Sequence, residues 1–375
     1  QKFKAFLTRK NIRPSAKLYF VDAMGSMALG LFATLLIGTI FETIGSYSFS
    51  NCYALKSFTI PAGCQSVGDY AFADLKNLAT LELGKLTSIG DYAFYRTAIK
   101  ATPDLSGVSV IGDYAFAHSG LESVTIPDGV TIGESSFREC KSLRSVKIGS
   151  NVVVGDSAFR LDVDTNFTAN SYKAGDYTLY YYILTSPMTE LTIGENAVIG
   201  TSAFHGAAKL ETVTIGKGAV IGDFAFYNND SLKNMDLSGV VSIGDSAFSC
   251  DMLAMFTNSG MTVQAYDEKG NYIYRFYAAD FESINLESAT SIGDNAFAQC
   301  RLLKDVKLGA GVTHIPEQAF FYCTNLKHVY NYAPVPQRIP PIFNKRGITL
   351  HVPRGSEEFY RHADNWNIAE VVGDL

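Results

Sequence analysis

A short sequence recurs along this chain at a nearly constant interval, and it limits the possible folds more than any other feature. SIGDYAF at 88–94 returns as VIGDYAF at 110–116, VIGDFAF at 220–226 and SIGDNAF at 291–297. A unit of about 22 residues cannot bury its own apolar face, whereas stacked units bury one continuous core. The chain is therefore predicted to be a repeat solenoid. The signature phenylalanines that mark its turns are Phe49, Phe72, Phe94, Phe116, Phe137, Phe159, Phe204, Phe226, Phe248, Phe297 and Phe320.

Two intervals in this series are about twice as long as the others. Phe159 and Phe204 are 45 residues apart, and Phe248 and Phe297 are 49 residues apart. Each long interval predicts one altered repeat in addition to the regular ones. We therefore expect about thirteen repeats of 22–23 residues.

The repeat at 121–140, LESVTIPDGVTIGESSFREC, shows what each unit contains. Its apolar residues Val124 and Ile126 alternate with polar ones, which is typical of a strand with one buried face. A turn follows at PDG, and Ile132 then returns to the core. In most copies an Asp comes after the Gly of IG, and we expect it to cap a short helical turn. Short parallel strands joined by short helical turns are the predicted architecture.

The Asp of the repeat permits a second interpretation. Asp69, Asp91 and Asp113 occupy the same place in three consecutive repeats. Stacked carboxylates of this kind could chelate calcium, which prefers oxygen ligands. Ser46 and Thr201 stand at the same position in other repeats. Because Ser and Thr cap helices but bind calcium poorly, capping is the favoured role.

The repeat pattern L-x-x-V-x-I-P-x-x-V-x-x-I-G-x-x-A-F-x-x-C resembles the BspA-like leucine-rich repeat of bacterial surface proteins and some parasitic protists. The resemblance implies a leucine-rich repeat right-handed superhelix over residues 43–330. The tail, with VYNYAPVPQRIP and ITLHVPRGSEEFYRHADNWNIAEVV, resembles the C-terminal cap of such proteins, a closing strand and an amphipathic helix over residues 331–375. For function, the resemblance to these proteins implies a non-enzymatic protein that adheres to other cells or to host proteins, including those of the extracellular matrix.

The N-terminal segment, residues 1–42, differs from the rest in composition. Residues 23–41 carry no charge and are preceded by six Lys and Arg residues. As one hydrophobic helix they would span about 28 Å, close to a bilayer core. The positive-inside rule then places the repeats outside the membrane that this helix anchors. A cleaved signal peptide and a buried core helix are the alternatives.

The same segment carries a second resemblance. RKNIRPSAKLYFVDAMGSMALGLFATLLIGTIFETIG is similar to the opening of a membrane IIC component of the sugar phosphotransferase system. Such a component continues with further membrane helices, whereas this chain passes directly into its first repeat. The resemblance leaves open a transport component that carries the repeats as an external domain. A purely structural surface protein is a further alternative.

Composition and motifs argue against several other functions. The net charge of −6 and the absence of a basic stripe disfavour nucleic acid as a partner. The six cysteines form no C-x-x-C pair, and the six histidines show no metal-binding spacing. No nucleophile elbow or phosphate-binding loop is present. We therefore expect no enzyme activity, no metal site and no cofactor.

Two aromatic segments are the predicted ligand-binding site. SYKAGDYTLYYY at 171–182 and AYDEKGNYIYRFY at 265–277 each place a Gly, Gly175 or Gly270, where a β-hairpin turns. These variant hairpin repeats, near 160–190 and 249–280, should leave the same side of the solenoid four repeats apart. Tyr is favoured at interfaces with proteins, and a protein or glycan ligand is expected, although the tyrosines could instead pack on the solenoid. The candidate ligand-binding residues are Tyr177, Tyr180, Tyr181, Tyr182, Tyr272, Tyr274 and Tyr277.

The outward residues of the longer strands form a second candidate surface. Their charges are mixed, and a solvated face is the favoured interpretation over a broad binding surface. These residues are Thr59, Glu82, Thr125, Lys147, Thr214, Asp236, Asn285 and Lys307.

Overall fold

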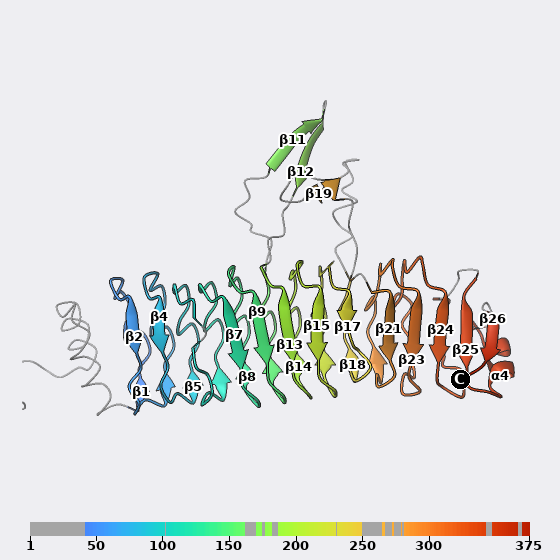
Figure 1. The fold of residues 1–375 in the computed structure, drawn as a ribbon, viewed down its shortest axis with the longest axis horizontal. Coiled ribbons are helices and arrows are strands. Elements are labelled where there is room, and N and C mark those ends of the chain that lie inside the picture. The colour runs from blue at the N-terminus through green and yellow to red at the C-terminus, as the bar shows by residue number, and fades with distance from the viewer. Residues whose placement is uncertain are drawn as a thin grey trace, which may run out of the picture.

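The chain forms a parallel β-solenoid, seen side-on in the computed structural model of Figure 1. The solenoid has about twelve turns, close to the thirteen expected from the sequence. The structure describes residues 42–101, 103–161, 170–174, 177–181, 187–229, 231–249, 265–266, 272–273, 279, 281–342, 347–366 and 370–375. The predicted N-terminal helix, and with it the 1–42 boundary, lies almost wholly outside these residues. No helix within the described ranges is both long and apolar enough to cross a membrane.

One side of the solenoid is a ten-stranded parallel sheet of two-residue strands. In each strand the second residue is buried and the first faces outward, as the apolar pattern of the repeat predicts. In sheet order the strands are β1 (Thr43–Ile44), β3 (Ser66–Val67), β5 (Ser88–Ile89), β6 (Val110–Ile111), β8 (Thr131–Ile132), β10 (Val153–Val154), β14 (Val198–Ile199), β16 (Val220–Ile221), β18 (Ser242–Ile243) and β22 (Ser291–Ile292).

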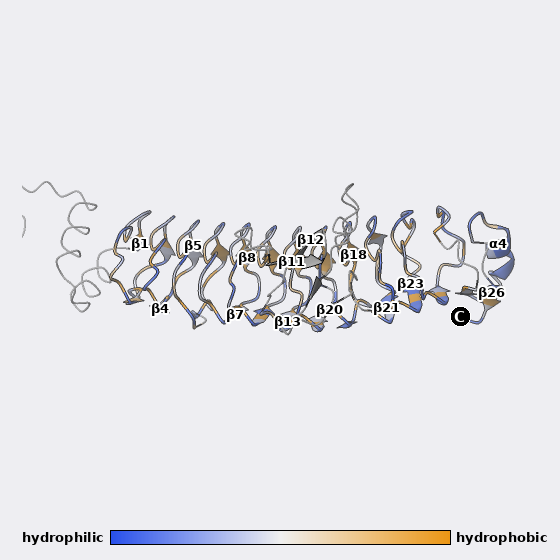
Figure 2. Ribbon diagram, turned by 90° about the horizontal axis from the view of Figure 1, so that it is seen from above, coloured by the Kyte–Doolittle hydropathy of each residue, from blue (hydrophilic) through white to orange (hydrophobic). Residues whose placement is uncertain are grey.

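The longer strands lie on the opposite side of each turn, as Figure 2 shows from above. They form three parallel groups, and buried residues alternate with outward ones along them. The first group is β2 (Ser57–Thr59) and β4 (Thr80–Glu82). The second is β7 (Ser123–Ile126), β9 (Ser145–Ile148), β13 (Glu190–Ile193), β15 (Thr212–Ile215) and β17 (Asn234–Met235). The third is β21 (Ser283–Leu286), β23 (Asp305–Leu308), β24 (His328–Asn331), β25 (Thr349–Val352) and β26 (Glu370–Gly373).

The signature phenylalanines form one continuous stack through the interior. Neighbouring rings lie 4.5 to 5.7 Å apart between centroids and within 19° of parallel. From Phe49 to Phe320, each of the eleven side chains is no more than 4% exposed. We call this stack the phenylalanine ladder. It joins the apolar residues of all these turns into the single core that the repeat predicted.

The prediction of helical turns after IG is wrong. The residue after the Asp adopts the left-handed conformation, with φ of 56° at Tyr70 and 55° at Tyr92. The N–H of Tyr70 then donates to the carbonyl of Asp91 in the next turn, at 2.8 Å, and Phe72 donates to Ala93 in the same way. These N–H groups bond across turns, so they cannot form helical bonds within one turn. The only α-helix among the described residues is α4 (Glu357–His362) in the cap.

The Asp of the repeat also has a different partner from the one expected. The Oδ1 atom of Asp69 accepts from the backbone N–H of Asp91, one turn later, at 3.0 Å, and Asp91 accepts from Asp113 at 2.9 Å. The carboxylate therefore satisfies a backbone donor of the next turn instead of capping its own. This contact also explains the Gly of IG. A Cβ on Gly90 would lie 2.5 Å from Oδ1 of Asp69 and 2.8 Å from its backbone nitrogen.

The two long intervals are insertions and do not contain an additional turn. Phe159 stacks directly on Phe204 at 5.1 Å, and Phe248 on Phe297 at 5.3 Å. At the first insertion β9 pairs with β13 and β10 with β14, so both sheets continue across it. At the second, β18 pairs with β22, while the longer strands β17 and β21 belong to different sheets. The prediction of an altered repeat in each interval is therefore wrong.

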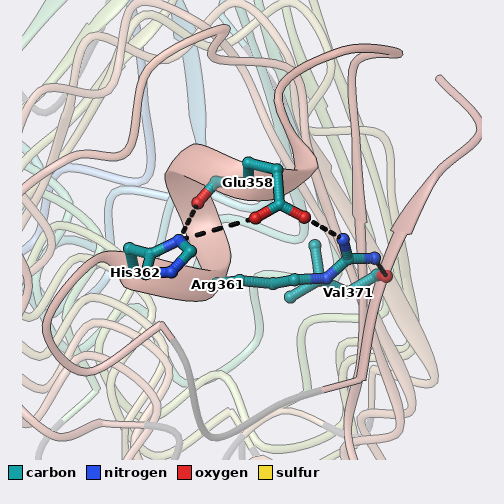
Figure 3. Close-up of polar contacts among 4 residues, drawn as sticks. All are labelled: Glu358, Arg361, His362 and Val371. Atoms are coloured by element: carbon teal, nitrogen blue, oxygen red, sulfur yellow. Dashed lines mark hydrogen bonds and ion pairs between the residues drawn. The ribbon is translucent and has the colours of Figure 1, made fainter.

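The C-terminal end has the predicted closing strand and short helix. Strand β26 is the last strand of its sheet, and α4 packs beside it. Figure 3 shows the polar contacts of this helix: Nη1 of Arg361 donates to Glu358 at 2.6 Å, and Nη2 donates to the carbonyl of Val371 at 3.3 Å. The fully buried Tyr360 donates its hydroxyl to the carbonyl of Ala333 at 2.7 Å. These contacts hold the helix against the last turns of the solenoid.

Candidate binding surfaces

Both aromatic segments form antiparallel hairpins, as the sequence predicted. Strand β11 (Asn170–Ala174) pairs with β12 (Tyr177–Tyr181), and β19 (Ala265–Tyr266) pairs with β20 (Tyr272–Ile273). In the sequence, Gly175 comes between β11 and β12, and Gly270 between β19 and β20. Of the candidate residues, Tyr177, Tyr180 and Tyr181 lie in β12 and Tyr272 in β20. Tyr182, Tyr274 and Tyr277 lie outside the described residues.

The two hairpins lie on the same side of the solenoid in Figure 1. The first insertion separates the turns of Phe159 and Phe204, and the second separates those of Phe248 and Phe297. Three turns, not the four expected, therefore separate the points of insertion. The three ring-to-ring steps between Phe159 and Phe248 are 5.1, 5.4 and 5.4 Å, about 16 Å in total.

The outward row of the longer strands has the mixed charges that the sequence indicated. Thr59, Glu82, Thr125, Lys147, Thr214 and Asp236 are exposed, whereas Asn285 and Lys307 are half-buried. Neighbours in this row bond to each other, as where the hydroxyl of Thr59 donates to Glu82 at 3.0 Å. Neither charges of one sign nor aromatic side chains are clustered in this row.

A second aromatic stack, on the outside of the molecule, was missed by the sequence analysis. Tyr47, Tyr70, Tyr92 and Tyr114 follow the Gly-Asp or Gly-Ser pair in four consecutive turns. Their rings lie 4.6 to 4.9 Å apart and within 5° of parallel. Tyr47 is 49% exposed, and the other three are half-buried. The signal is the Tyr of SIGDYAF itself, which stands at a variable position of the repeat pattern. We call this stack the tyrosine ladder.

Two of the cysteines that come three residues after a signature Phe, Cys140 and Cys323, are hydrogen-bond donors in the core. The Sγ atom of Cys140 donates to the carbonyl of Phe116 at 3.2 Å, and Cys323 donates to Phe297 at 3.2 Å. Burial raises the pKa of the Cys140 thiol to about 11 and that of Cys323 to about 12. Neither forms a disulfide, and the same holds for Cys52, Cys64 and Cys300. The thiols of Cys140 and Cys323 thus have a structural role, since the thiolate is the reactive form.

The histidine spacing had indicated no grouping, but the fold brings two histidines together. His328 and His351 are 23 residues apart, which is one repeat, and lie on the adjacent strands β24 and β25. Their nitrogens Nδ1 and Nε2 are 3.2 Å apart. A separation equal to the repeat length was the signal that could have found this pair.

A family model for the BspA-type leucine-rich repeat region, in six copies, matches residues 42–163, 175–267 and 271–339. The chain belongs to this family. The match covers most of the solenoid and includes parts of both insertions. It does not extend to the N-terminal segment, and the phosphotransferase resemblance gains no support from it. Among proteins with curated descriptions, no sequence matches the chain.

The solved structures that match the chain include two bacterial leucine-rich repeat proteins and a pneumococcal vaccine antigen. A leucine-rich repeat protein from Bacteroides ovatus is 19% identical, with a TM-score of 0.35, covering 89% of this chain and 87% of the other. The pneumococcal vaccine antigen PcpA is 15% identical, with a TM-score of 0.35 and coverage of 88% and 92%. A leucine-rich repeat protein from Eubacterium ventriosum is 20% identical, with a TM-score of 0.34 and coverage of 88% and 70%.

Proposed function

We propose that this chain is a non-enzymatic surface protein that binds a protein or glycan ligand through its two hairpins. In this proposal the repeats are extracellular, and the apolar segment 23–41 anchors them in the membrane. Adhesion to another cell or to an extracellular-matrix protein is the resulting activity. The proposal involves no cofactor and no nucleic acid.

The observation that carries this proposal is the placement of the hairpins. Both are Tyr-rich, each falls in the long interval after a signature Phe, and the rings of those two Phe residues are separated by three stacking steps of about 16 Å in total. Tyr offers a large, rigid contact area that can also hydrogen-bond, and it is enriched at binding hot spots. The solenoid can therefore hold two aromatic elements at a fixed spacing against one ligand.

A membrane transport component remains the alternative, and it rests on the resemblance of residues 1–45 to a IIC component. In that case the repeats would be an external domain of a permease. A structural surface protein without a saturable ligand is the third possibility. Ligand binding distinguishes both alternatives from the proposal.

The test is a titration of the full chain, in mild detergent, against extracellular-matrix proteins and a glycan array. A variant with Tyr181, Tyr182, Tyr272 and Tyr274 changed to Ser is expected to lose saturable binding while keeping its unfolding midpoint. A control with Tyr53→Ser and Tyr322→Ser removes two tyrosines that are 57% and 55% exposed on the solenoid. This control should bind as the original chain does. Equal binding by both variants would show that the hairpins are not the site.

A further inference from the structure

The C-terminal cap holds a pair of histidines joined to a carboxylate. His328 and His351 lie on β24 and β25, and Nδ1 of His328 is 3.2 Å from Nε2 of His351. On its other side, Nδ1 of His351 lies 2.9 and 3.0 Å from the two carboxylate oxygens of Asp374. Asp374 directly follows β26, so three successive strands of one sheet supply these three groups.

The carboxylate determines which nitrogen of His351 carries hydrogen. An ionised Asp can only accept, so Nδ1 of His351 donates to it and Nε2 presents a lone pair toward His328. The ring of Tyr330 stacks on His351 at 4.3 Å, within 14° of parallel, and the side chain of His351 is only 13% exposed. The orientation of this imidazole is thus fixed from two sides. A carboxylate behind a histidine is also how metal-binding histidines are commonly oriented.

We propose that Nδ1 of His328 and Nε2 of His351 bind a divalent transition-metal ion such as Zn²⁺, with Asp374 orienting His351 from behind. Two nitrogens that are each about 2.0–2.1 Å from a tetrahedral ion lie about 3.3 Å apart, close to the spacing found here. His351 keeps its orientation, while the ring of His328 turns so that the lone pair of its Nδ1 points to the ion, and His328 carries its hydrogen on Nε2. Rotations of this kind are available to histidine, because its outer torsion is broad.

The chemistry of the pair selects the class of metal. Imidazole nitrogens suit Zn²⁺, Cu²⁺ and Ni²⁺, whereas Ca²⁺ and Mg²⁺ prefer oxygen ligands. In the described part of the chain, no group of three His, Cys, Asp or Glu side chains forms a metal site. The ion therefore has two protein ligands here, and its remaining positions are open to water or to a group from a bound molecule.

The charged groups around the pair influence how binding depends on pH. Asp305 is the register partner of His328 on β23, and Lys307 is that of Tyr330 on the same strand. Glu370, on β26, is the register partner of Thr349. With Asp374, three carboxylates and one ammonium occupy the strands beside the pair. Both imidazoles bind metal only in their neutral form, so protons compete with the ion for these two nitrogens.

The experiment titrates Zn²⁺ alone into the full chain, prepared without a polyhistidine tag, and follows binding by calorimetry at about pH 7.5. One saturable site is expected, lost in H328Q and in H351Q. D374N should weaken binding about tenfold, the effect of removing an orienting partner. H362Q is the control, because His362 lies on α4 and contacts Glu358 instead. It should bind Zn²⁺ unchanged.

A second measurement does not depend on the folding of any variant. Cu²⁺ bound to the unaltered chain should show two coordinated nitrogens in its electron paramagnetic resonance spectrum. Equal Zn²⁺ affinity in H328Q, H351Q and the original chain would overturn the proposal. So would a Cu²⁺ spectrum without nitrogen coupling.

Discussion

Two aromatic ladders run along this protein with nearly the same spacing but in opposite environments. Phenylalanine rings stack at 4.5 to 5.7 Å inside the solenoid, and tyrosine rings stack at 4.6 to 4.9 Å on its outside. The inner ladder includes all eleven signature turns, whereas the outer one includes only the first four. Stacking distance therefore follows from the spacing of the turns, which is close to the 4.8 Å between paired strands. Burial is what distinguishes the two ladders.

The later turns show how freely the outer position varies. Ser135, Ser157, Phe224 and Asn295 take the place of the tyrosines, and all keep a φ between 53° and 56°. The backbone conformation of this position is therefore independent of its side chain. The inner position, by contrast, holds Phe in each of these turns. These turns therefore keep Phe at the inner position but do not need Tyr at the outer one.

The largest expected effect is on the inner ladder. Phe137→Ala removes a ring that is 1% exposed and stacked between Phe116 and Phe159. We expect the free energy of unfolding to fall by about 3–5 kcal/mol, measured by chemical denaturation. Phe137→Leu, which keeps most of the volume, should cost clearly less. A loss below about 1 kcal/mol in the alanine variant would remove the distinction between the ladders.

A smaller effect is expected at the Gly of IG, which precedes both ladder positions in the repeat. A Cβ on Gly112 would lie 2.5 Å from Oδ1 of Asp91 and 2.7 Å from its backbone nitrogen. Gly112→Ala should therefore cost about 1–3 kcal/mol through crowding between turns. Gly129→Ala is the control, because Gly129 has a φ of 72° and open space around it. Its cost of about 1–2 kcal/mol comes from the backbone alone.

The two glycines can be separated by a second measurement. Crowding at Gly112 pushes neighbouring turns apart, so it should also change the near-ultraviolet spectrum of the stacked tyrosines. The backbone strain that Gly129→Ala introduces should leave this spectrum unchanged. Identical spectra for the two variants would contradict the account of Gly112.

The outer ladder should respond weakly to substitution. Tyr92→Ser removes stacking on Tyr70 and Tyr114, but the ring is only half-buried. A loss of about 1 kcal/mol or less in unfolding free energy is expected, within the range of an aromatic pair. The same denaturation experiment as for Phe137 measures it. If Tyr92→Ser lowered the free energy of unfolding as much as Phe137→Ala does, both ladders would be structural.

The smallest effect is a shift in tyrosine titration. Desolvation, together with the neighbouring phenols and aspartates, raises the pKa of Tyr70 and Tyr92 above the ordinary value. The folded chain holds these protons more tightly than the unfolded one. This contribution to stability is therefore complete below about pH 10 and is lost as the pH rises toward the raised pKa values.

The difference in absorbance between the original chain and a Tyr70→Phe, Tyr92→Phe variant measures this titration. The difference signal should rise at a higher pH than that of the exposed tyrosines. A midpoint at the ordinary value would show that the outer ladder does not desolvate its phenols.

The sequence predicts those parts of the fold that depend on one repeat at a time. The period, the inward Phe and the alternation in Val124 and Ile126 are local patterns, and all three are confirmed. The role of Asp69 could not be deduced in the same way, because its partner is the backbone of the next turn. A helix cap and a bond between turns use the same residue type. Only the register between turns distinguishes them.

For the candidate surfaces, too, local patterns could be predicted, whereas contacts between turns could not. The hairpins were predicted, since a Gly between aromatic runs is a local signal. The prediction that each hairpin segment forms an additional repeat was wrong, because a length of 45 residues fits two turns as well as one turn with an insertion. The tyrosine ladder and the pair His328 and His351 depend on which residues face each other in adjacent turns. That information is contained in the repeat period, and residues one period apart should be compared first in chains of this kind.

The direct stacking of Phe159 on Phe204 and of Phe248 on Phe297 has a mechanical consequence. Tension along the axis passes from turn to turn through the ladder and the bonds between strands, and it bypasses both hairpins. A ligand pulling on a hairpin instead transmits its force to the turns at the base of that hairpin. The hairpins lie outside the path that carries axial force. Their length, or the strength with which they hold a ligand, can therefore change without weakening the solenoid.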